Sequence, residues 1–166
     1  MNKVGLATII VTTVVLGIFF WANRSTLNST EKALFDRIDE VIDQEPQASE
    51  IAPSFSLPEK CGKEGCFFDE VQVNNLSNSG GKLHPTPKGL VFELEGLGPQ
   101  CVRTAQIQKQ FGLGQVGDSC SHGPCWYLTI QKDWGHLSFA LENPTARCAS
   151  TFVINSLPHM RRTKKP

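Results

Sequence analysis

The chain has 166 residues, and its 16 Lys and Arg balance its 16 Asp and Glu, so the formal net charge is zero. This length suits one domain with extra segments, or two very small domains. The balanced charge predicts no broad basic surface, which argues against a function in binding nucleic acid.

The first expected element is a membrane anchor at residues 1–22. Residues 4–21 contain no charged side chain, and a run of this length is close to the shortest helix that spans a bilayer. A cleaved signal peptide is the alternative, but the run is long, ends in bulky side chains and precedes no A-x-A pattern. Lys3 before the run and Arg24 after it allow the N-terminus to stay inside. We therefore expect a single-pass inner-membrane protein whose C-terminal domain lies in the periplasm.

Residues 23–45 are expected to form an acidic juxtamembrane stalk helix. Asn28 followed by Glu31 resembles the cap that begins a helix, and Pro46 is a natural stop. Between them, apolar residues recur at helical spacing, at Leu34, Ile38, Val41 and Ile42. Leu27, Leu34 and Val41 are also seven residues apart, so weak self-association as a short coiled coil is the alternative to a simple stalk.

A folded domain is expected after this helix. Residues 46–58 contain three prolines and predict a linker. The periplasmic domain is expected over residues 59–157, and residues 158–166 form a tail with four basic side chains. A domain of about 100 residues buries only a modest core, so covalent cross-links would help to stabilise it.

The domain is expected to be α+β, with one helix packed on one face of a small antiparallel sheet. Residues 67–73 and 90–95 predict two strands, separated by a long turn-rich loop at residues 74–89. Residues 99–111 predict the helix, with Pro99 at its first position. Three more strands joined by tight turns form a meander, and they are expected over residues 126–131, 136–141 and 148–155.

Six cysteines follow the anchor, and an even number outside the cytosol favours disulfides. Two pairs share the spacing C-x4-C and would each close a small loop. The remaining pair would join the expected helix to the strand that the helix should cover. The hypothesis is therefore three disulfides, Cys61–Cys66, Cys120–Cys125 and Cys101–Cys148.

A zinc site or a catalytic thiol is the alternative use of these cysteines. The C-x4-C spacing lies at the limit for zinc ligands, and the redox spacing C-x-x-C is absent. Residues 117–120 resemble a fragment of a serine-protease nucleophile loop, but His122 and the other histidines lie in no partner motif. We expect no metal, no cofactor and no catalytic residue, and hence no enzyme.

The face of the sheet opposite the helix is expected to bind a protein partner, because it would display small or amphipathic side chains rather than charges. The candidate partner-binding residues are Trp134, Tyr127, Thr129, Gln131, His136 and Ser138. Trp134 falls in the turn between two expected strands. It either stays exposed as a binding hot spot or folds back over the edge of the sheet.

Four stretches, "TAQIQKQFG", "CWYLTIQ", "GHLSFAL" and "TFVIN", carry a likeness to a known fold. Together they make residues 98–156 resemble one repeat of the β-lactamase-inhibitor-protein-like fold, which is also seen in small outer-membrane assembly lipoproteins. The resemblance implies a binder that acts through a concave sheet face and its hairpin loops. The chain departs from the lipoprotein group because it lacks a cysteine placed for lipidation.

These expectations describe a non-enzymatic, membrane-anchored binding protein of the periplasm. Its most concrete form is an inhibitor or immunity protein that neutralises a toxin or hydrolase acting in the periplasm. The alternative is an accessory subunit of an envelope assembly or secretion complex, which would associate through its anchor and stalk.

Overall fold

The computed structural model describes residues 26–43, 46–57, 65–70, 72–73, 76–77, 80–87, 89–98, 100–118 and 125–156. The expected anchor at residues 1–22 and the basic tail at residues 158–166 lie outside these ranges. Within them, no helix has the length and apolar character needed to cross a membrane.

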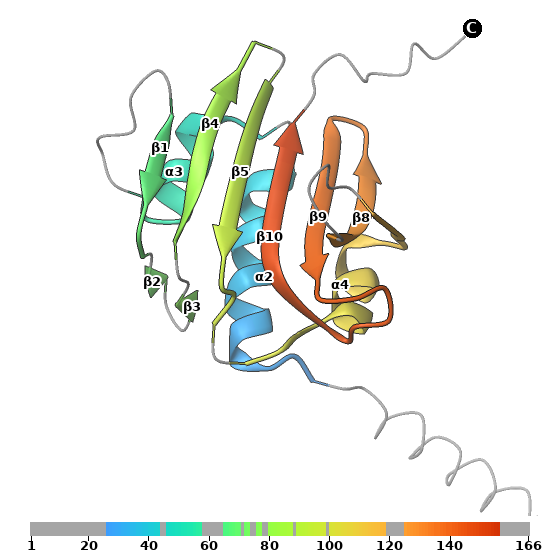
Figure 1. Cartoon of the computed structure of the whole chain (residues 1–166). Helices are drawn as coiled ribbons and strands as arrows, with labels where there is room; N and C mark the ends of the chain where they lie inside the picture. The colour runs from blue at the N-terminus through green and yellow to red at the C-terminus, as the bar shows by residue number, and fades with distance from the viewer. Residues whose placement is uncertain are drawn as a thin grey trace, which may run out of the picture.

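The fold is built on one eight-stranded sheet in which every pairing is antiparallel. The strands lie in the order β1 (Cys66–Phe68), β4 (Gly80–Thr86), β5 (Gly89–Glu95), β10 (Cys148–Ser156), β9 (Gly135–Leu141), β8 (Trp126–Lys132) and β7 (Gln115–Asp118) (Figure 1). A short strand, β6 (Val102–Arg103), pairs with the start of β10. Strands β2 (Gln72–Val73) and β3 (Leu76–Ser77) form a separate two-stranded sheet.

Three helices lie on one face of the large sheet: α2 (Ser29–Ile42), α3 (Ala48–Ser54) and α4 (Thr104–Phe111) (Figure 1). The core fills the space between these helices and the sheet. Phenylalanine rings join the two layers, and the Phe55 and Phe92 ring centroids lie 4.7 Å apart. The expected antiparallel sheet is confirmed, but three helices rather than one cover its face.

Helix α2 is part of this core, so the expectation of a free-standing stalk is wrong for residues 29–42. Leu34 and Ile38 are completely buried, and Phe35 is 1 % exposed. Phe35 widens the apolar stripe beyond the heptad positions, and a wide stripe is typical of a helix that packs on a globular core. Because the stripe is covered by the chain's own sheet, it is unavailable for the coiled-coil pairing.

The expected linker at residues 46–58 also belongs to the folded unit. It contains α3, and its apolar residues Ile51, Phe55 and Leu57 are buried. The prediction of a linker was wrong because it took the prolines as signs of irregular structure, whereas Pro53 lies inside the last turn of this short helix. The folded unit therefore begins at α2 rather than near residue 59.

Strand β4 lies within residues 74–89, where a loop was expected, and β7 follows α4 in a segment for which no strand was predicted. Strand β4 lacks a clean alternation because Gly81 lies where a side chain would collide with the Glu93 carbonyl and the Phe68 ring. The helix expected over residues 99–111 begins only at Thr104, since β6 precedes it. The three meander strands occur as expected, as β8, β9 and β10.

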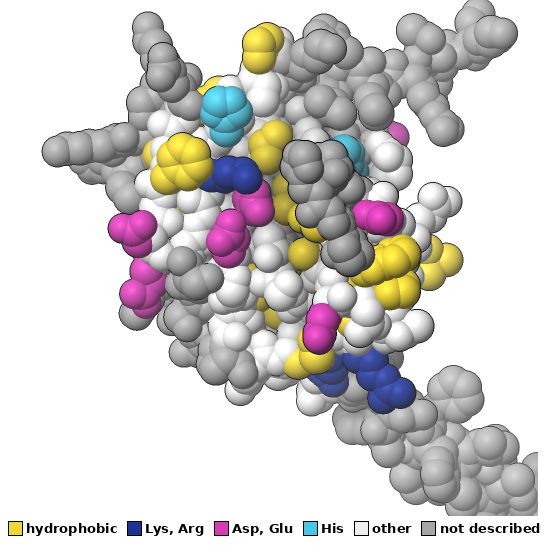
Figure 2. Space-filling model, in the orientation of Figure 1, with side chains coloured by type: hydrophobic (Ala, Val, Ile, Leu, Met, Phe, Trp, Pro, Cys, Tyr) yellow, Lys and Arg dark blue, Asp and Glu magenta, His cyan; other side chains and the backbone are white. Residues whose placement is uncertain are grey.

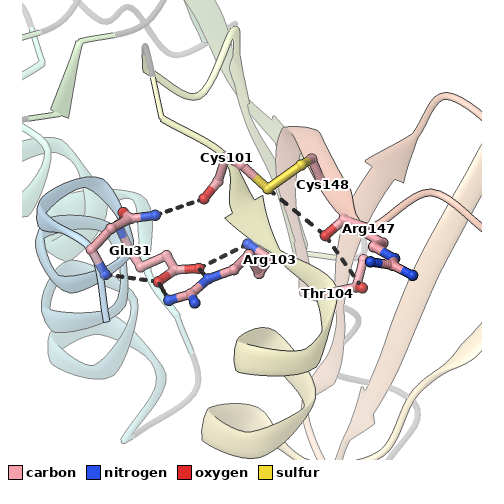
Figure 3. Close-up of a disulfide and its surroundings, with 7 residues drawn as sticks. Glu31, Cys101, Arg103, Thr104, Arg147 and Cys148 are labelled. Carbon is pink, nitrogen blue, oxygen red and sulfur yellow. Dashed lines mark hydrogen bonds and ion pairs between the residues drawn. A yellow bond between two sulfur atoms is a disulfide. The ribbon is translucent and has the colours of Figure 1, made fainter. Parts of the chain in front are cut away.

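A disulfide joins Cys101 to Cys148, which is the pairing expected from the sequence. The reason differs from the expected one, because Cys148 is exposed while Phe152 on the same strand is buried. A β-bulge at Ala149–Thr151 reverses the alternation between them. The two cysteines meet because β6 pairs with β10, which brings their Cα atoms to 5.2 Å (Figure 3).

The other two expected disulfides each involve a residue outside the described ranges, Cys61 and Cys120. Their expected partners, Cys66 and Cys125, are disulfide-bonded. No cysteine within the described part of the chain is a free thiol.

The start of α2 is fastened to β6 beside this disulfide (Figure 3). The Glu31 carboxylate is fully buried, and it accepts hydrogen bonds from Arg103 Nε at 2.7 Å and from the Arg103 backbone N–H at 2.9 Å. Asn28 and Glu31 complete the expected capping box, and Asn28 Nδ2 also donates to the Cys101 carbonyl at 2.8 Å. Helix α2 therefore reaches β10 through β6 and the disulfide.

Candidate functional site

The open face of the sheet, opposite the three helices, is the candidate site (Figure 2). Strand register arranges its side chains in three rows across the sheet. The rows are Glu95, Thr151, Ala140 and Tyr127; then Lys82, Glu93, Val153, Ser138 and Thr129; then His84, Val91, Asn155, His136 and Gln131. The centre of this face carries small and uncharged side chains.

Five of the six candidate partner-binding residues lie together on the open face. Strands β8 and β9 place them in or next to cross-strand pairs, Tyr127 with Ala140, Thr129 with Ser138, and Gln131 with His136. The Thr129 and Ser138 hydroxyl oxygens are 3.1 Å apart and share a hydrogen bond. Gln131 Nε2 donates to the Gly135 carbonyl at 2.7 Å, which holds its side chain beside the β8–β9 turn. Their role in binding stays a prediction.

The sixth candidate, Trp134, lies elsewhere. It is partly buried and packs against the hydrophobic core. The structure therefore favours the alternative in which this ring folds back against the domain, and Trp134 provides no exposed ring on the open face.

The sequence prediction missed a charged half of the open face, which β4 and β5 provide (Figure 2). Lys82 Nζ and Glu93 Oε2 form an ion pair at 2.5 Å. The hydrogen bond to Glu93 raises the pKa of Lys82 although burial works against it, and the charges of Glu93, Glu95 and Tyr127 add to the rise. The sequence did not predict this ion pair because the composition of β4 is typical of a loop. Without that strand, no pattern placed Lys82 beside Glu93.

Tyr127 and Lys82 lie on opposite sides of this face. Lys82 belongs to β4 and Tyr127 to β8, and three strands separate them in the sheet. In the row of Tyr127, the small residues Ala140 and Thr151 lie between it and Glu95.

His136 lies in the third row of the open face, between Gln131 and Asn155. Burial lowers its pKa below the ordinary 6.5, so the imidazole is neutral at neutral pH. In the parts of the chain that the structure describes, no group of three or more His, Cys, Asp and Glu side chains is placed to hold a metal ion. The described residues of the open face offer one ion pair and several hydroxyl and amide groups.

Comparisons with known proteins leave the family open. No protein-family model matches the sequence, and no curated protein matches it. A solved structure with a related outline is a DUF4309 family protein (YjgB) from Bacillus subtilis subsp. subtilis str. 168. The match has a TM-score of 0.45 and 16 % sequence identity, and it covers 78 % of this chain and 99 % of that one. A likeness at this level supports no functional assignment, and the resemblance of residues 98–156 to the β-lactamase-inhibitor-protein-like fold stays a prediction.

Proposed function

We propose that this chain is a non-enzymatic binding protein, anchored in the inner membrane, whose open face captures a protein partner in the periplasm. Its most concrete form is an inhibitor or immunity protein that neutralises a toxin or hydrolase acting there. The observation that carries the proposal is the open face itself: the three described helices all lie on the other face, and the described residues of the open face combine hydroxyl, amide and aromatic groups with the Lys82–Glu93 ion pair.

This mixture of side chains suits protein recognition. Tyr127 and Val153 are only partly exposed, so they offer apolar surface to a partner without forming a large exposed hydrophobic patch. Thr129 and Gln131 add donors and acceptors that would fix the orientation of a partner, and Ser138, which is buried, holds the Thr129 hydroxyl in place. Lys82 and the two acidic residues of β5 would form a charged rim at one side.

The compartment is supported by two separate features of the chain. The uncharged run at residues 4–21 suits a membrane anchor. Disulfides such as Cys101–Cys148 persist mainly in oxidising compartments. An anchor ending at residue 22 would hold the start of α2, at Ser29, close to the membrane.

Affinity capture with the full chain tests the proposal. Thr129→Arg would place a long charged side chain in the middle of the open face, while Ser49→Arg is the matched control on the exposed surface of α3. We expect a specific protein from solubilised envelopes to bind the wild type and Ser49→Arg but not Thr129→Arg. If no captured protein depends on Thr129, the open face is not the binding surface.

The identity of the captured protein separates the two forms of the proposal. A toxin or hydrolase supports the inhibitor or immunity role. Resident components of an assembly or secretion complex support the alternative, an accessory subunit. Removing residues 1–45 cannot distinguish these roles, because that deletion would remove the core helix α2.

A further inference from the structure

We propose that β7 is a pairing edge through which two copies of this chain associate, with their β7 strands side by side and antiparallel. Strand β7 lies at the end of the sheet, and all four of its residues are exposed. No strand within the described ranges pairs with its outer side. This inference goes beyond the proposed function and uses a different surface.

Strand β7 has only part of the usual protection of an edge strand: it is short and ends in Asp118, but it contains no Lys, Pro or bulge. Free edges present backbone N–H and C=O groups, and proteins commonly blunt them with Lys, Pro or a bulge. Strand β7 reads Gln-Val-Gly-Asp, and its register with β8 is continuous from Gln115 to Asp118. The outer side of Gln115, Val116 and Gly117 is therefore open to a further antiparallel strand.

Two apolar side chains at this edge are exposed, and the backbone that carries them packs closely on β8. Val116 is 44 % exposed and Leu113, just before the strand, is 89 % exposed. The chain between α4 and β7 packs closely on β8, since a Cβ at Gly114 would lie 2.7 Å from Leu128 Cδ1. A surface that is already ordered loses little conformational entropy when it binds.

A second copy of β7 fits this edge because the strand is self-complementary. With a two-fold axis at Val116, the two Val116 side chains face each other and Gln115 lies opposite Gly117 of the second copy. No atom lies within 4 Å of the position of a Cβ at Gly117, so there is room for the glutamine side chain. Asp118 would lie opposite Gly114 of the second copy, so no like charges are opposed. An interface built on such an axis is closed and uses the same patch twice.

The association is expected to be weak in solution. A four-residue edge buries far less than the roughly 1,600 Å² of a standard stable interface. Confinement of both copies to one membrane would raise their effective concentration and favour pairing.

Sedimentation equilibrium of the full chain in detergent micelles tests this pairing. We expect a reversible dimer for the wild type. Val116→Lys opposes two ammonium groups at the two-fold axis and should raise the dimer dissociation constant about tenfold or more. Leu27→Lys is the matched control, because it replaces another exposed apolar side chain far from β7, and it should leave the constant unchanged.

Cross-linking gives a second measurement that does not depend on a charged variant. Opposed residues of an antiparallel pair have Cα atoms about 4.5–5.5 Å apart, which a disulfide can bridge. Val116→Cys should therefore form a covalent dimer under mild oxidation, while Ser49→Cys should not. The pairing edge is wrong if the wild type stays monomeric, if Val116→Cys gives no covalent dimer, or if Leu27→Lys dissociates a dimer that Val116→Lys leaves intact. These measurements need no other protein, so their failure is separate from a failure of the open face to bind a partner.

Discussion

Glu31, which is buried, and Arg103, which is partly exposed, form an ion pair that fastens the first core helix to the central strand of the sheet through β6. Arg103 donates to the carboxylate through its side chain and through its backbone N–H, and Asn28 donates through its own backbone N–H. Because Arg103 belongs to β6, and β6 is held to β10 by pairing and by Cys101–Cys148, this contact joins α2 to the middle of the sheet. The helix that follows the proposed anchor is thus tied directly to the strands that carry the open face.

Removing the arginine should reveal the strength of this contact. Arg103→Met leaves the Glu31 carboxylate buried without its main partner, and we expect a loss of about 3 kcal/mol in the free energy of unfolding. Urea unfolding of the full chain, followed by tryptophan fluorescence, measures this loss. Lys32→Met is the matched control, because it breaks the exposed ion pair with Asp36 and should change the stability by at most about 0.5 kcal/mol.

The same carboxylate should make stability depend on pH in the acid range. Burial opposes the ionisation of Glu31, but hydrogen bonds from Arg103 and Asn28 outweigh it and hold its pKa below the ordinary 4.5. A pKa that is lower in the folded state stabilises the fold fully above the unfolded value. That stabilisation is lost as the pH falls below about 4.5 and through the folded pKa. Unfolding curves from pH 6 down to pH 3 should show a smaller acid loss for Glu31→Gln; an equal loss in both proteins would contradict this role.

The Cys101–Cys148 disulfide closes a loop of 47 residues. In the chain-entropy model, a loop of this size stabilises the folded state by about 4 kcal/mol. The double variant Cys101→Ser and Cys148→Ser should lower the midpoint of thermal unfolding accordingly, as measured by circular dichroism. An unchanged midpoint would mean that β6 is held to β10 by strand pairing alone.

Two glycines near β7 offer a matched test of packing. A Cβ at Gly114 would lie 2.7 Å from Leu128 Cδ1 and 2.9 Å from Ile130 Cγ1, whereas nothing lies within 4 Å of that position at Gly117. We expect Gly114→Ala to cost about 1–3 kcal/mol and Gly117→Ala to be neutral or slightly stabilising. Urea unfolding of both variants checks the contrast, and equal effects would mean that the segment before β7 does not pack closely on β8.

The part of the fold that the sequence predicted well is the part where alternation is regular. Strands β8 and β9 alternate cleanly, and a tight turn joins them, so the placement of Thr129 and Ser138 on one face could be expected. The burial of α2 could not be expected in the same way. A helical stripe containing Leu34 and Ile38 suits a coiled coil and a core helix equally, and only the position of Phe35 beside it indicates the wider contact.

The charged rim that β4 and β5 give the open face could not be predicted from the sequence, for a different reason. Lys82 and Glu93 are 11 positions apart, and their pairing depends on the register of β4 with β5. Gly80, Gly81 and Pro85 give β4 the composition of a loop, because close packing against Glu93 and Phe68 excludes larger side chains at Gly81. Such a strand is recognised only when its partner is known.

Photo-cross-linking from the open face in living cells tests the central claim most directly. A photoreactive amino acid would replace Tyr127 on the open face, and Ser49 on the helix side would be replaced as the matched control. We predict that Tyr127 gives a cross-linked adduct with a second protein and that Ser49 gives none. An adduct from Ser49 together with none from Tyr127 would contradict the assignment of the open face as the binding surface.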